Sequence, residues 1–320
     1  MNTEKFEQLV EKFKTTLDIT DNHLQMNSFA IKQNGDCFIY RFNNRMEASD
    51  IRSLSKTVMA LVTGKVFELS RQGVYPKIDL DTNIFPIIEK LVNLTNLKNL
   101  KYLKQINIKH LLTHTIGYDK MLLMRGDIID LDPFSYLDYL INYPIKYQPG
   151  TVYLYSNAGF YLLSVILQEF INEDLFAFVK RELFEPLEIN NANWIKYGNY
   201  LAGATRLWLQ PEDLIKIGEL LLNDGTYKGK QILPKSWIKE MTTIQEYNPN
   251  HDLSNRKHLL YYAYGYGIWL NKKEIYFASG TDGQYIVIVP EKKAIIITQA
   301  QQKDPNPIRN IIDEIIENYL

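Results

Sequence analysis

Ser53 and Lys56 stand three residues apart at the start of a largely apolar run that continues to Leu69. In a helix, residues i and i+3 share a face with Cβ atoms about 5–6 Å apart, so the lysine amine can reach the serine hydroxyl. Apolar residues cover more than one side of this segment, which predicts a central, buried helix. Burial disfavours the charged form of a lysine and lowers its pKa. A neutral amine beside a serine is a base beside a nucleophile.

The Ser-x-x-Lys spacing is not specific by itself. It recurs at Ser236/Lys239 and at Ser254/Lys257, both in polar surroundings. Ser236 follows a Leu-Pro-Lys sequence that is typical of an ordinary helix start with serine as cap. Partners for Ser53 must therefore come from other parts of the chain.

A second candidate group lies about a hundred residues later, where Tyr155-Ser156-Asn157 precedes a strongly apolar stretch. Tyr155 offers a phenol for proton transfer, and Asn157 offers an amide that both donates and accepts hydrogen bonds. The alternative is purely structural, with Ser156 or Asn157 capping the helix that follows.

A third candidate group is Ser279-Gly280-Thr281, which places a glycine at the end of a predicted strand. Glycine in a strand often marks close approach of a ligand or of another backbone. The alternative is a simple hairpin turn at 281–283.

The order of these three motifs resembles that of the penicillin-recognising serine hydrolases, in particular the class C β-lactamase-related branch. The resemblance runs over most of the chain. Residues 108–117 are similar to the family's Leu-Leu-Thr-His-Thr-Ser-Gly segment, with Ile116 in place of the serine. Gln148-Pro149-Gly150 and Ala202-Gly203-Ala204 are also similar to family segments.

The resemblance implies that Ser53 attacks a carbonyl and forms an acyl-enzyme, while Lys56 and Tyr155 share the proton transfers. Neutral Lys56 as base with Tyr155 as relay, and cationic Lys56 with Tyr155 as base, both remain open because two such groups titrate as a coupled pair. The resemblance implies an oxyanion hole formed by the backbone N–H groups of Ser53 and Thr281. It also implies four residues for substrate binding and the oxyanion hole together: Asn157, Ser279, Gly280 and Thr281.

The third motif departs from the family's Lys-Thr-Gly, because it reads Ala278-Ser279-Gly280. In relatives that lysine helps to hold a substrate carboxylate. Its absence predicts weak carboxylate selection, so uncharged short-chain esters or amides should be better substrates than benzylpenicillin or cephalothin. By motif order, Arg206 is the candidate to replace the lysine.

The periodicity of the chain predicts an α+β fold. An amphipathic helix near residues 6–17, a hairpin around Asn34-Gly35 and the Ser53 helix open the chain, and strands from 264 to 299 and an amphipathic helix close it. Residues 76–230 are mostly helical in pattern. We therefore predict an antiparallel β-sheet from 1–75 and 231–320, flanked by the terminal helices, with an inserted α-helical domain from 76–230 and an active site in the cleft between them.

Composition narrows the possible functions. A net charge of −1 gives no reason to expect nucleic acid as a partner, and the longest uncharged run is broken by Pro149-Gly150 and Asn157, so no membrane span is expected. The N-terminal segment lacks the apolar region of a signal peptide, which favours a cytoplasmic protein. His110 and His114 lack the glutamate of a zinc-peptidase motif, and no complete phosphate-binding glycine loop is present. We expect these histidines to serve packing or to brace loops, and neither a metal nor a cofactor to be needed.

These observations predict a serine hydrolase acting on an amide or ester of a small molecule or short peptide, D-amino-acid derivatives included. A β-lactamase and an acyltransferase of the same family are the alternatives. A third alternative is a catalytically silent protein that binds peptides or cell-wall fragments.

Overall fold

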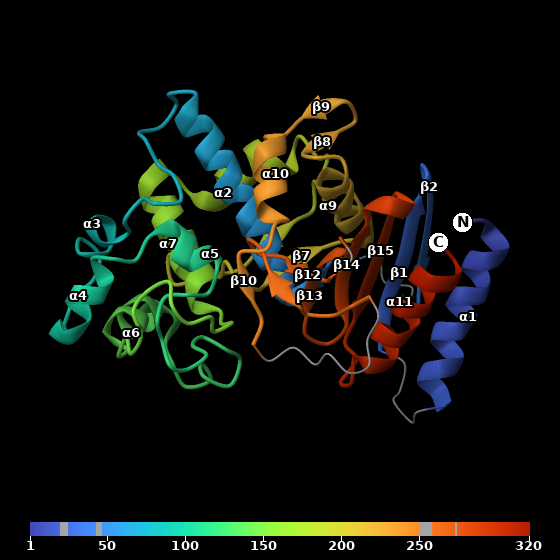
Figure 1. Cartoon of the computed structure of the whole chain (residues 1–320), viewed down its shortest axis with the longest axis horizontal. Coiled ribbons are helices and arrows are strands. Elements are labelled where there is room, and N and C mark those ends of the chain that lie inside the picture. The colour runs from blue at the N-terminus through green and yellow to red at the C-terminus, as the bar shows by residue number, and fades with distance from the viewer. Residues whose placement is uncertain (20–24, 43–46, 250–257, 273) are drawn as a thin grey trace.

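The computed structural model describes residues 1–19, 25–42, 47–249, 258–272 and 274–320. The repeat of the Ser-x-x-Lys pattern at Ser254/Lys257 lies outside the described residues. Figure 1 shows a sheet with helices on both faces and a helix-rich part beside it.

The central sheet is antiparallel throughout, as predicted. Within the described residues it has eight strands in the order β10-β11-β12-β13-β14-β15-β1-β2. The N-terminal hairpin pairs with β15, so the two chain ends meet in one sheet. The strands are β1 (Met26–Gln33), β2 (Asp36–Arg41), β10 (Glu246–Tyr247), β11 (Ala263–Tyr264), β12 (Trp269–Leu270), β13 (Tyr276–Gly280), β14 (Gln284–Val289) and β15 (Ala294–Ala300).

The terminal helices α1 (Thr3–Ile19) and α11 (Asn306–Asn318) pack on one face of this sheet (Figure 1). Their apolar stripes, which include Phe13 and Ile312, meet alternate residues of β1 and β14 such as Phe29 and Val287. Alternation arises because successive strand residues point to opposite faces. Burying each such side chain contributes roughly 1.5–3 kcal/mol, so the predicted flanking helices hold the sheet.

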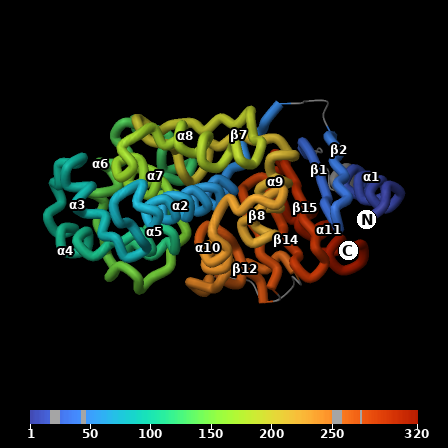
Figure 2. The backbone as a smooth tube through the Cα atoms, turned by 90° about the horizontal axis from the view of Figure 1, so that it is seen from above, coloured from blue at the N-terminus to red at the C-terminus, as the bar shows by residue number. Residues whose placement is uncertain are grey.

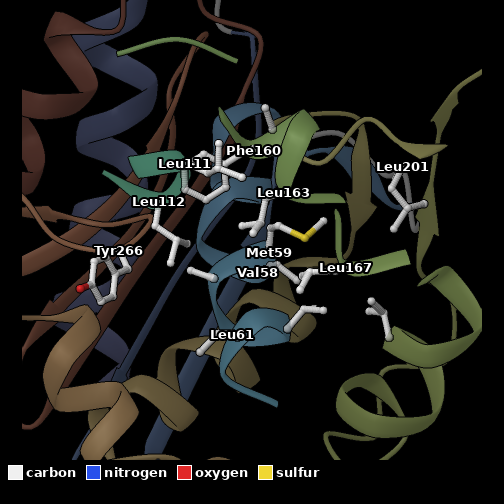
Figure 3. Packing of buried hydrophobic residues seen from close by; sticks show 14 of the residues in the cluster. Val58, Met59, Leu61, Leu111, Leu112, Phe160, Leu163, Leu167, Leu201 and Tyr266 are labelled. Carbon is white, nitrogen blue, oxygen red and sulfur yellow. The ribbon is translucent and has the colours of Figure 1, made fainter. Parts of the chain in front are cut away.

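The opposite face is covered by α9 (Pro211–Leu222) and by α2 (Ser55–Arg71). A Cβ on Gly218 would lie 2.6 Å from Ile295 Cγ2, so glycine here permits α9 to approach β15 closely. Helix α2 is surrounded by apolar residues of α5 (Ile108–Leu112) and α7 (Ala158–Ile171), including Leu111 and Leu163 (Figure 3). The predicted central, buried helix is thus present and carries Lys56, whereas Ser53 lies in the turn directly before it.

The helix-rich part lies at the far end of α2 from the terminal helices (Figure 2). Its helices and helical turns are η2 (Leu97–Asn99), η3 (Pro133–Ser135), η4 (Lys180–Phe184), α3 (Phe85–Ile88), α4 (Leu100–Leu103), α5, α6 (Tyr136–Asn142), α7 and α8 (Leu175–Val179), with α10 (Lys235–Met241) and η5 (Pro290–Lys292) elsewhere in the chain. The domain boundaries near 75 and 231 stay a prediction, and α9 packs on the sheet although it falls within 76–230.

Several short strands of this region gave no signal in the sequence. A small sheet in the order β3-β7-β4 joins the segment before Ser53 to residues near 194 and 208. Two further sheets have two strands each. Its strands are too short for an alternating pattern. They are β3 (Ser49–Asp50), β4 (Asn193–Trp194), β5 (Lys196–Tyr197), β6 (Tyr200–Leu201), β7 (Leu207–Leu209), β8 (Thr226–Tyr227) and β9 (Lys230–Gln231).

The pattern of residues 264–270 predicts one continuous strand, and this prediction is wrong. The segment from Tyr264 to Leu270 forms β11 and β12 with a tight turn between them. Gly267 has φ +71°, a left-handed conformation that favours glycine, and this turn reverses the chain. The turn packs on the first turn of α2, because Thr57 Oγ1 donates a hydrogen bond to the Gly267 carbonyl. Among the described residues, no helix combines the length and apolar character needed to cross a bilayer.

Candidate active site

Ser53 lies in a 3-10 turn, η1 (Arg52–Leu54), between β3 and α2. Arg52, directly before it, has φ +54°, a left-handed conformation that is costly for a residue with a side chain. Asp50 holds this turn, since its carboxylate accepts the Arg52 backbone N–H at 2.9 Å and Arg52 Nη1 at 2.7 Å. The serine is therefore presented by a strained, braced turn at the entrance of a buried helix.

Lys56 is completely buried, and its amine is held by three oxygen atoms. Nζ lies 3.0 Å from Ser53 Oγ, 2.8 Å from Asn157 Oδ1 and 3.2 Å from the Ala204 carbonyl oxygen. Burial lowers the pKa of Lys56 to about 7, because desolvation penalises the ammonium form. The predicted contact between lysine and serine is thus made, by an amine that is largely neutral above neutral pH.

Tyr155 also lies next to the serine, and the two side chains interact. Its ring stacks on Trp269 with centroids 5.3 Å apart and packs against His114 at 4.6 Å. Lys56 Nζ lies 4.8 Å from the centre of the same ring. Burial raises the pKa of Tyr155 well above its usual value, and the interaction with Ser53 opposes this only in part. Tyr155 therefore stays protonated at neutral pH.

Asn157 occupies the N-cap position of α7, but its side chain makes no capping hydrogen bond. Nδ2 instead donates to the Leu123 carbonyl at 2.8 Å, which turns Oδ1 toward Lys56. Ser156 takes the capping role, because its Oγ accepts the Ala158 N–H at 3.2 Å. Of the two interpretations open at the sequence level, capping applies to Ser156 and contact with the lysine to Asn157.

The third motif lies at the end of β13, against the turn that carries the serine. A Cβ on Gly280 would lie 2.9 Å from both Arg52 Cβ and the Ile51 carbonyl oxygen, so only glycine fits without a shift. Thr281 lines the same pocket as Ser53. Ser279 points its hydroxyl elsewhere, to Tyr261 Oη at 2.7 Å. The structure thus brings Gly280 and Thr281 to the serine, and engages the Ser279 hydroxyl with a tyrosine.

The pocket above Ser53 has a volume of about 270 Å³. Asn157, Thr281 and Arg206 line it, as do several residues that the sequence motifs did not indicate. Those residues come from turns and loops whose position depends on tertiary contacts: Arg52, Leu123, Met124, Arg125, Ile128, Tyr197, Thr205 and Asp282.

The two histidines of segment 108–117 take structural positions. His110 completes a capping box with Asn107 at the start of α5. His114 is buried against Tyr155 and Tyr264, and its pKa lies well below the usual value because of burial and the nearby Lys56. In the part of the chain that the structure describes, no group of three His, Cys, Asp or Glu side chains is placed to hold a metal ion. Ser236 lies in the first turn of α10.

A comparison with protein families gives a match between the Beta-lactamase family and residues 43–319. That match includes each of the site residues described above. The chain belongs to the β-lactamase family. Its fold is the β-lactamase/transpeptidase fold.

Solved structures of this fold superpose on almost the whole chain. A putative 6-aminohexanoate-dimer hydrolase from Bacillus anthracis is 21% identical, with a TM-score of 0.71 over 96% of this chain and 80% of that one. The octameric penicillin-binding protein homologue from Pyrococcus abyssi is 19% identical, with a TM-score of 0.74 over 98% and 77%. A β-lactamase/D-alanine carboxypeptidase from Pseudomonas syringae is 16% identical, with a TM-score of 0.71 over 98% and 99%.

One curated relative matches over a short stretch. N-acetylmuramyl-L-alanine amidase of Bacillus subtilis is 33% identical over 55 residues, which is 17% of this chain and 12% of that protein. The match therefore spans only a small part of that relative's length.

Proposed function

We propose that this protein is a serine hydrolase that cleaves an ester or amide of a small substrate through an acyl-Ser53 intermediate. The observation that carries the proposal is the set of atoms around Lys56 Nζ. Two of its three neighbours, Asn157 Oδ1 and the Ala204 carbonyl, only accept hydrogen bonds, whereas the third is the Ser53 hydroxyl, which can also donate.

This arrangement suits a neutral amine acting as a general base. The two hydrogens of an NH₂ group point to the two pure acceptors, which leaves the nitrogen lone pair for the Ser53 hydroxyl. After the serine proton moves to Nζ, the resulting ammonium donates to all three oxygens. No other contact has to break, and 3.0 Å is within the reach required of a general base. Of the two assignments left open by the sequence, neutral Lys56 as base is therefore favoured.

Tyr155 then acts as the proton carrier to the leaving group. Because burial keeps its phenol protonated, Tyr155 can donate its proton to the departing oxygen or nitrogen and regain one from the Lys56 ammonium. In acylation, the serine oxygen bonds to the substrate carbonyl carbon, the bond to the leaving group breaks, and the serine proton ends on the leaving group. In deacylation, water attacks the ester of Ser53 and returns a proton to the serine oxygen.

The oxyanion formed in each step needs donors at its own position. We assign this role to the backbone N–H groups of Ser53 and Thr281, which lie on the two segments that Gly280 allows to approach. Removal of one such donor in a serine hydrolase costs about 2.7–4 kcal/mol in transition-state stabilisation.

The names of the relatives support a small amide as substrate. A 6-aminohexanoate-dimer hydrolase, a D-alanine carboxypeptidase and an N-acetylmuramyl-L-alanine amidase are all named for cleavage of amide-linked substrates. The pocket of about 270 Å³ lies just below the size range of typical ligand sites, which favours a compact substrate.

Covalent labelling tests the proposal directly. The protein is treated with a fluorophosphonate, and intact mass and peptide mapping are recorded for wild type, Ser53→Ala and Ser236→Ala. We expect one adduct, on Ser53, that persists in Ser236→Ala and is lost in Ser53→Ala. Labelling of Ser236, or no adduct on a folded wild-type sample that also fails to hydrolyse short-chain esters, would overturn the assignment and favour a silent binding protein.

A further inference from the structure

The pocket above Ser53 is rich in arginine. Arg52, Arg125 and Arg206 all line it, and the one acidic lining residue is Asp282. A second carboxylate, Asp50, lies directly behind, with only 6% of its side chain exposed. Three guanidinium groups thus face two carboxylates, which leaves one positive charge without a counterion among these five residues.

Arg52 is fully engaged with the two carboxylates. Its Nη1 lies 2.7 Å from Asp50 Oδ2, and its Nε lies 3.2 Å from Asp282 Oδ2. Only 21% of its side chain is exposed. Arg52 therefore bridges the turn before Ser53 to the turn after Thr281, and its position as a brace leaves it poorly placed to bind a ligand.

Arg125 and Arg206 are held more loosely. Arg206 Nη1 lies 3.7 Å from Asp50 Oδ2, beyond hydrogen-bond distance, and 43% of its side chain is exposed. Arg125 Nη2 lies 3.3 Å from Asp282 Oδ2, with 68% of its side chain exposed. Each guanidinium has five N–H donors in a fork that matches a carboxylate. Most of these donors remain available to a ligand.

The backbone around both arginines is held in a defined shape. Arg206 has φ +64°, and its side chain interacts with that of Tyr197, another pocket residue. Arg125 follows Leu123, which has φ +56° and whose N–H is accepted by Asp127 Oδ2 at 2.9 Å. The backbone segments that carry Arg125 and Arg206 are therefore held in place beside the pocket that contains Ser53.

We propose that Arg206 and Arg125 form an anion subsite beside Ser53, which selects ester or amide substrates that carry a single carboxylate. This inference rests on the proposed hydrolase function for its kinetic consequence. It also reverses the substrate preference predicted from the missing third-motif lysine, because the pocket obtains its cations from two other segments. A monoanion balances the one unpaired charge, whereas an uncharged substrate leaves it unbalanced.

The test compares substrates that differ only in a carboxylate against a carboxamide. One pair carries the group on the acyl side: the 4-nitrophenyl monoester of succinic acid and the 4-nitrophenyl ester of succinamic acid. The other pair carries it on the leaving side: O-acetyl-lactate and O-acetyl-lactamide. We expect kcat/KM to be at least tenfold higher for the carboxylate member of one pair, the gain of a charge-assisted hydrogen bond being roughly one to two decades. The pair that discriminates shows on which side the anion sits.

Variants connect the preference to the arginines. Arg206→Gln and Arg125→Gln should each reduce the carboxylate-to-carboxamide ratio of kcat/KM, and the double variant should bring this ratio to about one. Arg71→Gln is the matched control, because Arg71 ends α2 about 25 Å from the Ser53 end at 1.5 Å per residue. A wild-type ratio below about three in both pairs, or a ratio unchanged in the double variant, would overturn the subsite.

Binding to Ser53→Ala separates this proposal from the hydrolase proposal. Titration followed by NMR should give a lower Kd for the carboxylate member of the preferred pair, and the double arginine variant in the Ser53→Ala background should remove the difference. If the carboxylate binds more tightly but no substrate is turned over by wild type, the subsite stands and the hydrolase proposal fails. If esters are turned over but carboxylate and carboxamide members do not differ in rate or binding, the hydrolase proposal stands and the subsite proposal fails.

Discussion

The side-chain amide of Asn157 donates a hydrogen bond to the backbone carbonyl of Leu123 at 2.8 Å. Leu123 sits in a left-handed conformation, φ +56°, and Asp127 accepts its N–H. Because this carbonyl takes the amide nitrogen, the amide oxygen of Asn157 must face Lys56. A loop that contacts no reacting atom thereby sets the hydrogen-bonding environment of the proposed base.

The pH dependence of hydrolysis follows from the pKa of Lys56. Burial lowers this pKa to about 7, and the base is the deprotonated amine. We therefore expect kcat/KM for an uncharged ester to fall about tenfold per pH unit below pH 7 and to level off above it. A profile of kcat/KM from pH 5 to 9 checks this. A profile in which kcat/KM keeps rising until the usual lysine pKa of about 10.4 would contradict this expectation.

Asn157→Asp should shift the pH at which kcat/KM begins to fall. A carboxylate beside the buried amine favours the ammonium form, and a charge at such a distance shifts a pKa by about 1–3 units. We expect the acidic limb of kcat/KM to move upward by at least about one pH unit. Activity at pH 7 then falls and recovers at higher pH. Asn191→Asp, at an exposed position, is the control and should leave the profile unchanged.

Lys56→Met should change how folding stability depends on pH. The folded-state pKa of Lys56 lies below its unfolded value, so the wild type carries no penalty above about pH 10, where both states are neutral. The penalty grows as pH falls to about 7 and is constant below. We expect urea unfolding to show the wild type losing stability relative to Lys56→Met by about 1.4 kcal/mol per pH unit between pH 9 and 7. Lys239→Met, an exposed control, should show no such trend.

Local patterns predicted the parts of the site that depend on short-range spacing. The contact between Ser53 and Lys56 follows from three residues of separation at a helix start. The hairpin of β1 and β2 follows from Asn34-Gly35 between two strand-like runs. Tyr155 and Asn157 were found only through the order of the motifs, because nothing in their own segment distinguishes a functional turn from a capped helix.

The remaining residues of the site depend on long-range contacts. Arg125 reaches the pocket because Asp127 and Tyr139 hold its loop, and no periodicity encodes that arrangement. Asp282 is part of the site because its carboxylate meets Arg52, which lies 230 residues earlier in the chain. The small sheet of β3, β7 and β4 was not predicted, because strands of two or three residues are too short to show an alternation of apolar and polar residues.

Arg52 offers a test of how the two proposed oxyanion donors are held. Arg52→Gly and Arg52→Ala both remove the bridge between Asp50 and Asp282, but glycine accepts a φ of +54° without strain. We expect Arg52→Gly to be more stable than Arg52→Ala by about 1 kcal/mol in urea unfolding. Both variants should lose kcat on an uncharged ester by about tenfold or more, with little change in KM. Normal kcat in Arg52→Gly would show that the bridge does not position the donors.

The proton-transfer roles of Lys56 and Tyr155 can be tested by a double-mutant cycle. If the serine proton passes to Lys56 and the tyrosine proton to the leaving group, loss of either group interrupts one transfer path. Residues that act as a unit show strongly non-additive losses. Lys56→Met and Tyr155→Phe should each lower the acylation rate by about a hundredfold or more, and the double variant should be no more than a few-fold slower than the worse single variant.

Tyr153→Phe is the matched control for this cycle. Its hydroxyl is buried two residues from Tyr155, and within the described residues it has no hydrogen-bond partner. Its removal should therefore leave the acylation rate within about twofold, since no contact is lost. Pre-steady-state measurement of the first turnover with a 4-nitrophenyl ester gives the rates. Losses that add fully in log rate would mean that Lys56 and Tyr155 contribute independently, and the shared transfer path would have to be abandoned.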